Sequence, residues 1–323
     1  MKATARAHSN IALVKYWGKR DAALNLPAAG SLSLTLAGLT TTTTVTFGEG
    51  SADALILDGR AMPPAALDKA RRVLDLVRER AGLRLPARIE SHNDFPTGAG
   101  LASSASGLSA LTVAAAAAAG LDLGRTALSA IARVGSGSAC RSLFGGFVEW
   151  QAGSLADGSD SVAVPLHPPE HWDLRVVVAV VSEREKPVGS TRGMEHTRET
   201  SPYHVPYLAT VDADLRAARE AIAARDLHGL ARVAERSSLR MHAAMMGADP
   251  ALTYLTSDTW QVIEAVRGLQ RAGAPAFLTM DAGPNVKVFC APDAVETVRR
   301  ALLELRSVRR LVAARPGAGA ELV

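Results

Sequence analysis

The stretch that most constrains the fold of this chain lies at residues 95–107. It reads FPTGAGLASSASG, and the Ala-rich segment LSALTVAAAAAAG follows it at once. Because Ala is the best helix former, we expect a helix over residues 109–119, with the Ser residues at or just inside its first turn. The Gly-rich residues before that helix predict a loop that leads into it.

The start of such a helix is suited to an anion. Its first turn leaves free backbone N–H groups and a partial positive charge, and Gly residues let an anion approach the backbone. The stretch therefore indicates a phosphate cradle, with a hydroxyl of Ser103, Ser104 or Ser106 available to Mg²⁺. The alternative is a Gly/Ser-rich loop that only caps a helix. Both interpretations stay open, because the stretch fits neither the Walker pattern nor the dinucleotide fingerprint.

Length and composition predict a globular chain. The 323 residues suit one large domain or two of ordinary size. With 48% hydrophobic and 21% charged residues, the chain can bury a substantial core. The net charge of +4 comes from basic residues scattered through helical patterns, without the dense basic run that nucleic-acid binding needs. We therefore expect no nucleic-acid partner, while an anionic small substrate fits the basic balance.

Cysteine usage and hydropathy predict the compartment. Cys140 and Cys290 form neither a disulfide framework nor a metal-ligand spacing, which is typical of a reducing cytoplasm. The N-terminal residues MKATARAHSNIAL have no apolar signal core. The longest apolar run, 108–121, is too short to span a bilayer, so we expect no membrane attachment.

Periodicity predicts a mixed α/β (α+β) chain. Alternating or β-branched runs predict strands over 3–14, 31–36, 40–47, 53–57 (paired with residues around 60), 87–91, 147–151, 174–181, 276–280, 286–290 and 309–314. Amphipathic runs predict helices over 65–81, 126–133, 207–224, 227–244, 259–272 and 295–305, and a short one opening in 135–142. We expect a functional loop with some helix over 183–203 and a frayed tail after residue 315.

Five segments carry a more specific pattern. They are SNIALVKYWGKRD (9–21), FPTGAGLASSASG (95–107), GSGSACRSLFGGF (135–147), KPVGSTRGM with ETS (within 186–201) and MDAGPN (280–285). Together they resemble the mevalonate diphosphate decarboxylases, members of the galactokinase, homoserine kinase, mevalonate kinase and phosphomevalonate kinase (GHMP kinase) superfamily. The central loop alone marks only the superfamily, whereas KYWGK, GSGSACRS and DAGPN are specific to the family.

The resemblance implies a two-domain GHMP kinase fold. Residues 1–182 would form a ribosomal-protein-S5-like N-terminal domain and residues 183–323 a ferredoxin-like C-terminal domain, with the active site in the cleft between them. It implies an enzyme that uses ATP and Mg²⁺ to phosphorylate the 3-hydroxyl of mevalonate 5-diphosphate and then expels phosphate and CO₂, giving isopentenyl diphosphate. It also implies a homodimer.

The resemblance assigns four catalytic residues. Asp281, on a turn with Gly283 and Pro284, would face the 3-hydroxyl, orienting it and accepting its proton. Arg141 would grip the substrate carboxylate in two-pronged fashion, and Asn10 would hydrogen-bond the same carboxylate. Lys15 would lie near the γ-phosphate. Without the family, an Asp that caps a tight turn and exposed Arg and Lys side chains are the plainer interpretations.

Binding residues follow in the same way. Tyr16, Lys19, Ser138 and Ser190 resemble the residues that hold the diphosphate, and the role of Ser136 cannot be separated from that of Ser138. The nucleotide side would consist of Gly98, Gly100, Ser103 and Ser104, with Ser104 as the Mg²⁺ ligand. For each Ser the alternative is backbone capping. His8 and His242 are expected to be structural or to support site residues from behind, because neither has metal-ligand spacing.

Three departures from the family pattern leave the substrate open. PAAGSLS follows Leu26, PTGAG stands where PTAAG is commoner, and Arg198 replaces a smaller residue near the phosphate end. We hypothesise that Arg198 changes the preference between a diphosphate and a monophosphate tail. The alternatives are therefore a phosphomevalonate decarboxylase, a kinase that stops at the phosphorylated product, and a non-catalytic ligand-binding homologue. Retention of Asp281, Arg141 and Lys15 together favours the full reaction.

Overall fold

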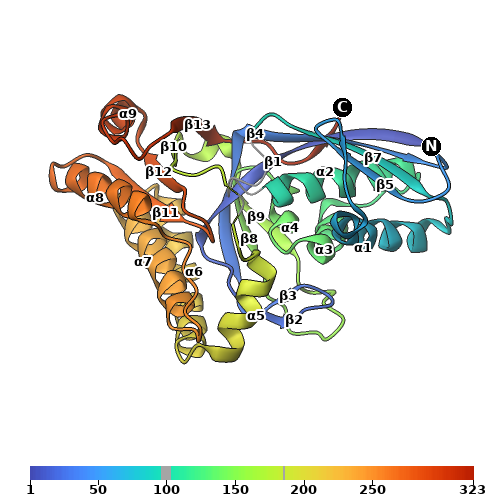
Figure 1. Ribbon diagram of the computed structural model, residues 1–323, viewed down its shortest axis with the longest axis horizontal. Coiled ribbons are helices and arrows are strands. Elements are labelled where there is room, and N and C mark those ends of the chain that lie inside the picture. The colour runs from blue at the N-terminus through green and yellow to red at the C-terminus, as the bar shows by residue number, and fades with distance from the viewer. Residues whose placement is uncertain (96–102, 185) are drawn as a thin grey trace.

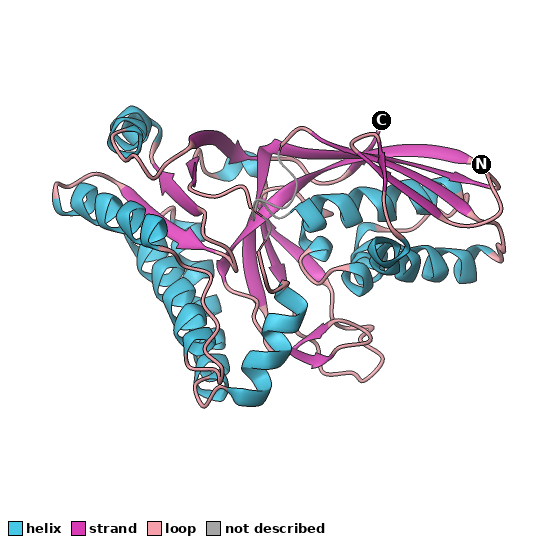
Figure 2. Cartoon of the chain, in the orientation of Figure 1, coloured by secondary structure: helices cyan, strands magenta, loops and turns pink. Residues whose placement is uncertain are grey.

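The computed structural model describes residues 1–95, 103–184 and 186–323. Two groups of helices flank long central strands, with α1–α4 on one side and α6–α9 on the other (Figures 1 and 2). Within the described ranges, twelve strands join into one sheet, and β2 (Lys19–Asp21) with β3 (Leu26–Pro27) forms a separate ribbon. The mixed α/β class is confirmed.

The centre of the sheet is the antiparallel pair β1 (Lys2–Val14) and β4 (Ser31–Phe47). β4 is continuous, although the sequence predicts two strands with a break between them. The register against β1 shifts between His8 and Ser9, and Gly38 has a φ of +94°. A bulge of this kind bends a strand without ending it, which accounts for the difference.

Five further strands and four helices complete the N-terminal part. The strands are β5 (Ala54–Leu57), β6 (Arg60–Ala61), β7 (Ala87–Asn93), β8 (Phe147–Trp150) and β9 (Ala163–His167), of which β9 has no counterpart in the prediction. The helices are α1 (Pro64–Ala81), α2 (Ser103–Ala118), α3 (Arg125–Gly135) and α4 (Ala139–Ser142). α1 ends at Gly82 in the left-handed conformation (φ 64°), as the sequence predicts.

Helix α2 includes the Ser cluster and extends to Ser103, six residues ahead of the predicted start. Ser106, in the added part of the helix, is fully buried, and its hydroxyl donates to Ser103 O of the same helix at 3.3 Å. Its hydroxyl lies 2.7 Å from Thr41 Oγ1 and 3.3 Å from Ser9 Oγ. These contacts to β1 and β4 satisfy the hydroxyl inside a helix, so Ser106 has a packing role.

The second half of the chain forms one end of the sheet. Its strands run in the order β11 (Ala276–Met280), β12 (Val286–Cys290), β10 (Arg175–Val180) and β13 (Arg310–Pro316). Its helices are α5 (Ser190–Thr200), α6 (His204–Ala224), α7 (Leu227–Met246), α8 (Ser257–Arg271) and α9 (Val295–Leu303), with short 3₁₀ turns η1 (Pro169–His171) and η2 (Pro292–Ala294). The predicted helices over 65–81, 126–133, 207–224, 227–244, 259–272 and 295–305 are confirmed to within three residues at each end. The domain division at residue 182 stays a prediction; β10 pairs with β12 and β13, which come after it.

The prediction of a frayed tail is wrong. β13 continues to Pro316 and pairs with β4, and β14 (Glu321–Leu322) pairs with β1. Between them, Gly146 N donates to Gly317 O at 3.0 Å and Ala320 N donates to Ser142 O at 3.1 Å. The Gly residues allow this approach, because a Cβ on Gly317 would lie 2.3 Å from Ala37 N. The tail is therefore an ordered part of the fold, held by strand pairing at both of its ends.

Candidate active site

A cavity of about 810 Å³ brings the predicted site residues together. It lies between the end of β1, helix α1, the α3–α4 turn, the start of α5 and the turn after β11. Ten of the predicted residues line it: Asn10, Lys15, Tyr16, Lys19, Ser104, Ser136, Ser138, Arg141, Ser190 and Asp281. Ser103 is half-buried and is absent from the described lining. Gly98 and Gly100 lie outside the residues that the structure describes.

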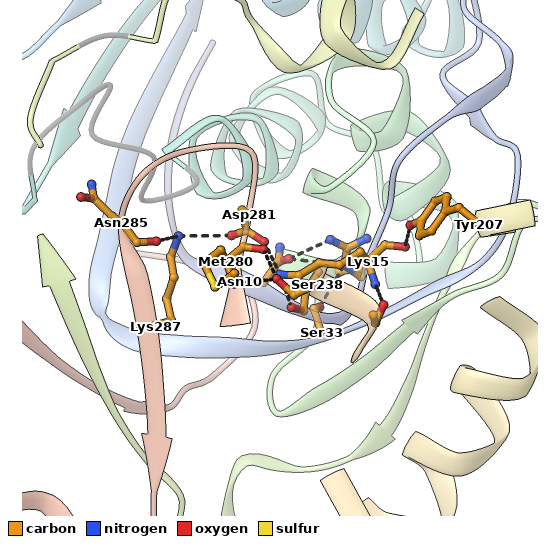
Figure 3. Close-up of polar contacts among 12 residues, drawn as sticks. Asn10, Lys15, Ser33, Tyr207, Ser238, Met280, Asp281, Asn285 and Lys287 are labelled. Atoms are coloured by element: carbon orange, nitrogen blue, oxygen red, sulfur yellow. Dashed lines mark hydrogen bonds and ion pairs between the residues drawn. The ribbon is translucent and has the colours of Figure 1, made fainter. Parts of the chain in front are cut away.

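Asp281 is held between two buried lysines (Figure 3). Lys15 Nζ donates to Asp281 Oδ1 at 2.7 Å, and Lys287 Nζ lies 3.5 Å from Oδ2. Each lysine side chain is 1% exposed, whereas that of Asp281 is 29% exposed. Burial alone would raise the pKa of Asp281, but the two cations outweigh it and hold that pKa well below its usual value. Asp281 is therefore a carboxylate anion that faces the cavity.

Lys15 is fixed through its backbone as well as its side chain. Its N–H donates to Ser237 Oγ and its C=O accepts from Tyr207 Oη, both at 3.0 Å, while Nζ also donates to Ala12 O at 2.7 Å. Burial lowers the pKa of Lys15 to about 8, although Asp281 acts in the opposite direction. The ammonium group is charged at neutral pH and is close to its titration range.

Helix α7 holds Asp281 from the other side. Ser238 follows Ser237, which accepts from the Lys15 N–H. The Ser238 hydroxyl donates to Met280 O and accepts from Met280 N, both at 3.0 Å. β11 is an edge strand, so Ser238 satisfies backbone groups that the sheet leaves open. One turn further on, His242 contacts the Asp281 backbone, and burial lowers the pKa of this histidine to about 3. The expectation that His242 is structural agrees with this position.

Arg141 is buried and forms no ion pair with a carboxylate of the described residues. Its Nε donates to Ser33 Oγ at 2.9 Å and its Nη1 to Ser31 Oγ at 2.6 Å. No carboxylate oxygen of the described residues lies within 4 Å of the guanidinium, and burial lowers the pKa of Arg141 even though Cys140 and Asp281 raise it. With these bonds made, each Nη nitrogen keeps one N–H, which suits a two-pronged contact with an anion.

Asn10 orients that guanidinium. Its Oδ1 accepts from Arg141 Nε at 3.3 Å and from Nη2 at 3.1 Å. Its Nδ2 donates to Ser138 O at 2.9 Å and to Ser142 Oγ at 2.7 Å. The amide is thus occupied within the protein, and its direct bond to a substrate carboxylate stays a prediction.

The far end of the cavity is rich in cations. Lys19 Nζ donates to Asn25 Oδ1 at 2.5 Å, and burial, aided by the nearby Lys69 and Arg72, lowers the pKa of Lys19 to about 8. The Tyr16 hydroxyl is buried and has no hydrogen-bond partner among the described residues. Ser136 Oγ and Ser138 Oγ are 3.3 Å apart. Crowded cations and an unpartnered donor are what an anionic ligand would satisfy.

Several lysines and arginines at the cavity were missed from the sequence. Lys186 Nζ donates to Ser190 Oγ at 2.7 Å and to Ala282 O at 3.0 Å, and burial lowers its pKa. The other basic residues of the described lining that the sequence analysis did not single out are Lys69, Arg72 and Arg192. A signal was available: the chain has only six lysines, and Lys15, Lys19, Lys69, Lys186 and Lys287 all lie at this site.

The remaining predicted groups are placed as follows. Ser104 is exposed at the start of α2 and lines the cavity, so its hydroxyl is available to a phosphate-bound cation. Arg198 pairs with Glu199 at 2.8 Å, is half-exposed, and lines a smaller hollow of about 240 Å³ together with Lys19. The described residues contain no group of three or more His, Cys, Asp or Glu side chains that could hold a metal. None of their helices is both long and apolar enough to cross a membrane.

Two family models match the chain. The diphosphomevalonate decarboxylase-like N-terminal domain covers residues 7–163, and the mevalonate 5-diphosphate decarboxylase C-terminal domain covers residues 176–313. Among curated relatives, the diphosphomevalonate decarboxylases of Homo sapiens and Candida albicans are 39% and 40% identical. Their alignments cover 90% and 89% of this chain and 77% and 83% of the relatives.

Solved structures agree over the whole chain. A structure described as MDDEF in complex with MVAPP, AMPPCP and magnesium has a TM-score of 0.94 at 43% identity, and the match covers 100% of this chain and 99% of that one. Mevalonate diphosphate decarboxylase from Staphylococcus aureus also has a TM-score of 0.94, at 40% identity, with 100% and 98% covered. The two-domain GHMP kinase fold is thereby confirmed, and this chain belongs to the mevalonate diphosphate decarboxylase family.

Proposed function

We propose that this chain catalyses the ATP-dependent decarboxylation of mevalonate 5-diphosphate to isopentenyl diphosphate, releasing ADP, phosphate and CO₂. The observation that carries the proposal is the convergence, in one cavity, of the Asp281 anion, of Arg141, which pairs with no carboxylate of the described residues, and of a cluster of cations. The related structure with MVAPP, AMPPCP and magnesium supports the choice of substrates.

Substrate binding is assigned to the two cationic parts of the cavity. The diphosphate binds at Lys19, Tyr16, Ser136, Ser138 and Ser190, where the unpartnered Tyr16 hydroxyl gains an acceptor. The carboxylate binds to the two remaining N–H groups of Arg141, which Asn10 orients. This arrangement leaves the tertiary 3-hydroxyl of the substrate beside Asp281.

In the phosphoryl transfer, Asp281 accepts a hydrogen bond from the 3-hydroxyl and aims its oxygen at the γ-phosphorus. As the new O–P bond forms and the bond to ADP breaks, the hydroxyl becomes strongly acidic and its proton passes to the carboxylate, a weak base being sufficient at that stage. The Lys15 ammonium group attracts the transferred phosphoryl oxygens. Positioning and charge thus supply most of the catalysis.

In the elimination, the C–O bond to the new phosphate breaks and positive charge develops on the tertiary carbon. Asp281 first returns its proton to solvent or phosphate. Its anion, which lies beside the reacting carbon, then stabilises the positive charge on that carbon. The C–C bond to the carboxylate then breaks, CO₂ leaves, and the electron pair forms the double bond. Because its pKa is held low, Asp281 regains its charge readily.

The nucleotide side is assigned to the start of α2. Ser104 would hold Mg²⁺ there, because its exposed hydroxyl lines the cavity at a helix start. Magnesium, when bound, supplies charge neutralisation of the phosphate oxygens. Ser103 frames the same turn.

One assay distinguishes the proposed reaction from its alternatives. ADP and CO₂ are measured together with ATP, Mg²⁺ and either mevalonate 5-diphosphate or mevalonate 5-phosphate. Equal release of both products from the diphosphate supports the proposal. ADP without CO₂ would indicate a kinase, a preference for the monophosphate would indicate a phosphomevalonate decarboxylase, and binding without turnover would indicate a non-catalytic homologue.

We also propose a cytoplasmic homodimer whose domains divide near residue 182. The buried free thiols of Cys140 and Cys290 support a reducing compartment, and the dimer rests on the family resemblance. Light scattering of the purified protein tests the dimer: a mass of one chain at micromolar concentration would contradict it.

A further inference from the structure

Lys287 is a buried cation for which the proposed reaction has no use. It lies on β12, and its Nζ is 3.5 Å from Asp281 Oδ2 and donates to Asn285 O at 3.4 Å. Asp281 lines the cavity, whereas Lys287 is absent from its described lining. Figure 3 shows the Asp281 carboxylate in contact with both Lys287 and Lys15, and of these three residues Lys287 is the one absent from the described lining.

The position of Lys287 is one that an apolar residue would fill at lower cost. Its strand neighbours Val286 and Val288 are fully buried, and it pairs across the sheet with Val178 of β10 and Thr279 of β11. Removing an ammonium group from water is costly unless the charge is paired. A lysine in the middle of this sheet therefore indicates a role for its charge, and the charge nearest to it is that of Asp281.

The two lysines that contact Asp281 differ in their access to ligands. Lys15 binds Oδ1 and lines the cavity, so an incoming phosphoryl group competes with Asp281 for this ammonium group. Lys287 binds Oδ2 from the buried side and is out of reach of such a group. When Lys15 is engaged by phosphate, Lys287 is the lysine contact that Asp281 keeps.

We propose that Lys287 is a positioning residue, which holds the Asp281 carboxylate in place and in its charged form while Lys15 contacts the transferred phosphoryl group. The inference rests on the proposed function, because it assigns an anionic phosphoryl group to Lys15. A buried carboxylate beside phosphates and without a cation would take up a proton. Lys287 prevents this without competing for substrate.

Other charged groups also face Asp281. Arg141 on α4 and Lys186 before α5 lie on the cavity side, where bound anions neutralise them. His242 on α7 is neutral near pH 7, because burial lowers its pKa to about 3. Among the described residues, Lys287 is thus the cation that contacts the carboxylate from the side away from the cavity.

The first test compares Lys287→Met, which removes the charge at similar length, with Lys287→Arg, which keeps it. We measure kcat from about pH 5 to about pH 9 with ATP, Mg²⁺ and mevalonate 5-diphosphate. In Lys287→Met, Asp281 titrates at higher pH, so turnover falls about tenfold for each pH unit below that new pKa and recovers above it. Wild type and Lys287→Arg keep a flat acidic side. An equal loss in both variants at every pH would overturn the proposal, because it would reflect packing alone.

The second test does not depend on turnover. Lysine labelled with ¹³C at Cε is titrated by NMR in the free protein, with the Lys15 signal assigned from Lys15→Arg. Burial is the main cause that lowers the pKa of Lys15 to about 8, and the nearby charge of Lys287 lowers it further, so Lys287→Met should raise that pKa and Lys287→Arg should not. An unchanged Lys15 titration in Lys287→Met would overturn the proposal.

A variant that fails to fold and a wild-type protein that lacks the proposed activity can each be distinguished from failure of the Lys287 proposal. If circular dichroism shows that Lys287→Met does not fold, Lys287→Gln replaces it as the neutral variant. If the wild-type protein releases no CO₂, the proposed function fails, and the NMR titration alone decides whether Lys287 acts on the Asp281–Lys15 pair.

Discussion

Asn10 Oδ1 accepts hydrogen bonds from two nitrogens of Arg141, Nε at 3.3 Å and Nη2 at 3.1 Å. Ser33 Oγ also accepts from Nε and Ser31 Oγ accepts from Nη1, so neutral oxygens fix the guanidinium, and no carboxylate of the described residues lies within 4 Å of it. A side chain that is charged, buried and fixed by neutral oxygens is prepared for an anion that arrives from outside.

The first prediction concerns this guanidinium. Arg141→Lys should lower kcat/KM for mevalonate 5-diphosphate about 100-fold, because a point cation cannot make the two-pronged contact. Steady-state kinetics measure the loss, and Arg299→Lys on the exposed face of α9 is the control. Kinetics within threefold of wild type would contradict the role of Arg141.

The second prediction concerns the anion. Asp281→Ala should reduce turnover by about three to four powers of ten while nucleotide binding stays nearly intact, because the residue acts on the reacting carbon and oxygen. Rapid-quench turnover and nucleotide titration by calorimetry measure the two properties. Asp281→Asn keeps the shape and should lose activity to a similar degree, whereas the exposed Asp122→Ala should not. Near-normal turnover of Asp281→Ala would refute the assignment.

The third prediction is a pH dependence. Burial lowers the pKa of Lys15 to about 8, and burial together with Lys69 and Arg72 lowers the pKa of Lys19 to about 8. Both cations are lost as pH rises through this value, so kcat/KM should fall on the basic side. Asp281 should add no acidic limb near neutral pH, because its pKa is held well below its usual value.

Bound phosphates stabilise both ammonium groups, so the basic limb of kcat should lie at higher pH than that of kcat/KM. Lys19→Arg, which stays charged, isolates the contribution of Lys15. A kcat limb at lower pH than the kcat/KM limb would contradict this account.

The fourth prediction tests the tail preference. Arg198 lines the smaller hollow together with Lys19. Its side chain and that of its partner Glu199 are both about half-exposed. Arg198→Ala should shift the ratio of kcat/KM between the diphosphate and monophosphate substrates, by about threefold to tenfold in favour of the monophosphate. Arg192, which lines the main cavity, stays unchanged in this variant, so that any shift in the ratio is due to Arg198. An unchanged ratio removes the hypothesis.

Much of the fold could be predicted because its patterns are local. The helix over 65–81 and its stop at Gly82 follow from periodicity and a C-terminal glycine. The start of α2 could not be predicted in this way, because the contacts of the buried Ser106 hydroxyl there include Thr41 and Ser9, which are distant in sequence. The tail PGAGAELV resembles a Gly-rich end that would fray, yet its partners are β1 and β4.

The site shows the same division. The segments around Lys15, Arg141 and Asp281 carried a family pattern, and the structure brings these residues to one cavity. Lys287 lies in a run that predicts an ordinary strand. Its contact with Asp281 depends on the turn that joins β11 to β12, which local patterns do not specify. In the sequence, Ser237 and Ser238 are two residues of an amphipathic helix like any others. Only the structure shows that they contact Lys15 and Met280.

The pairing of β14 with β1 and of β13 with β4 has a consequence for anyone who would separate the two halves. Arg6 is bonded to Glu321, 315 positions away, so a fragment ending near residue 182 would expose a bare edge on the strand that leads to Lys15. Contacts of such separation in sequence form only after long loops have closed, so we expect the assembly of this sheet to be slow.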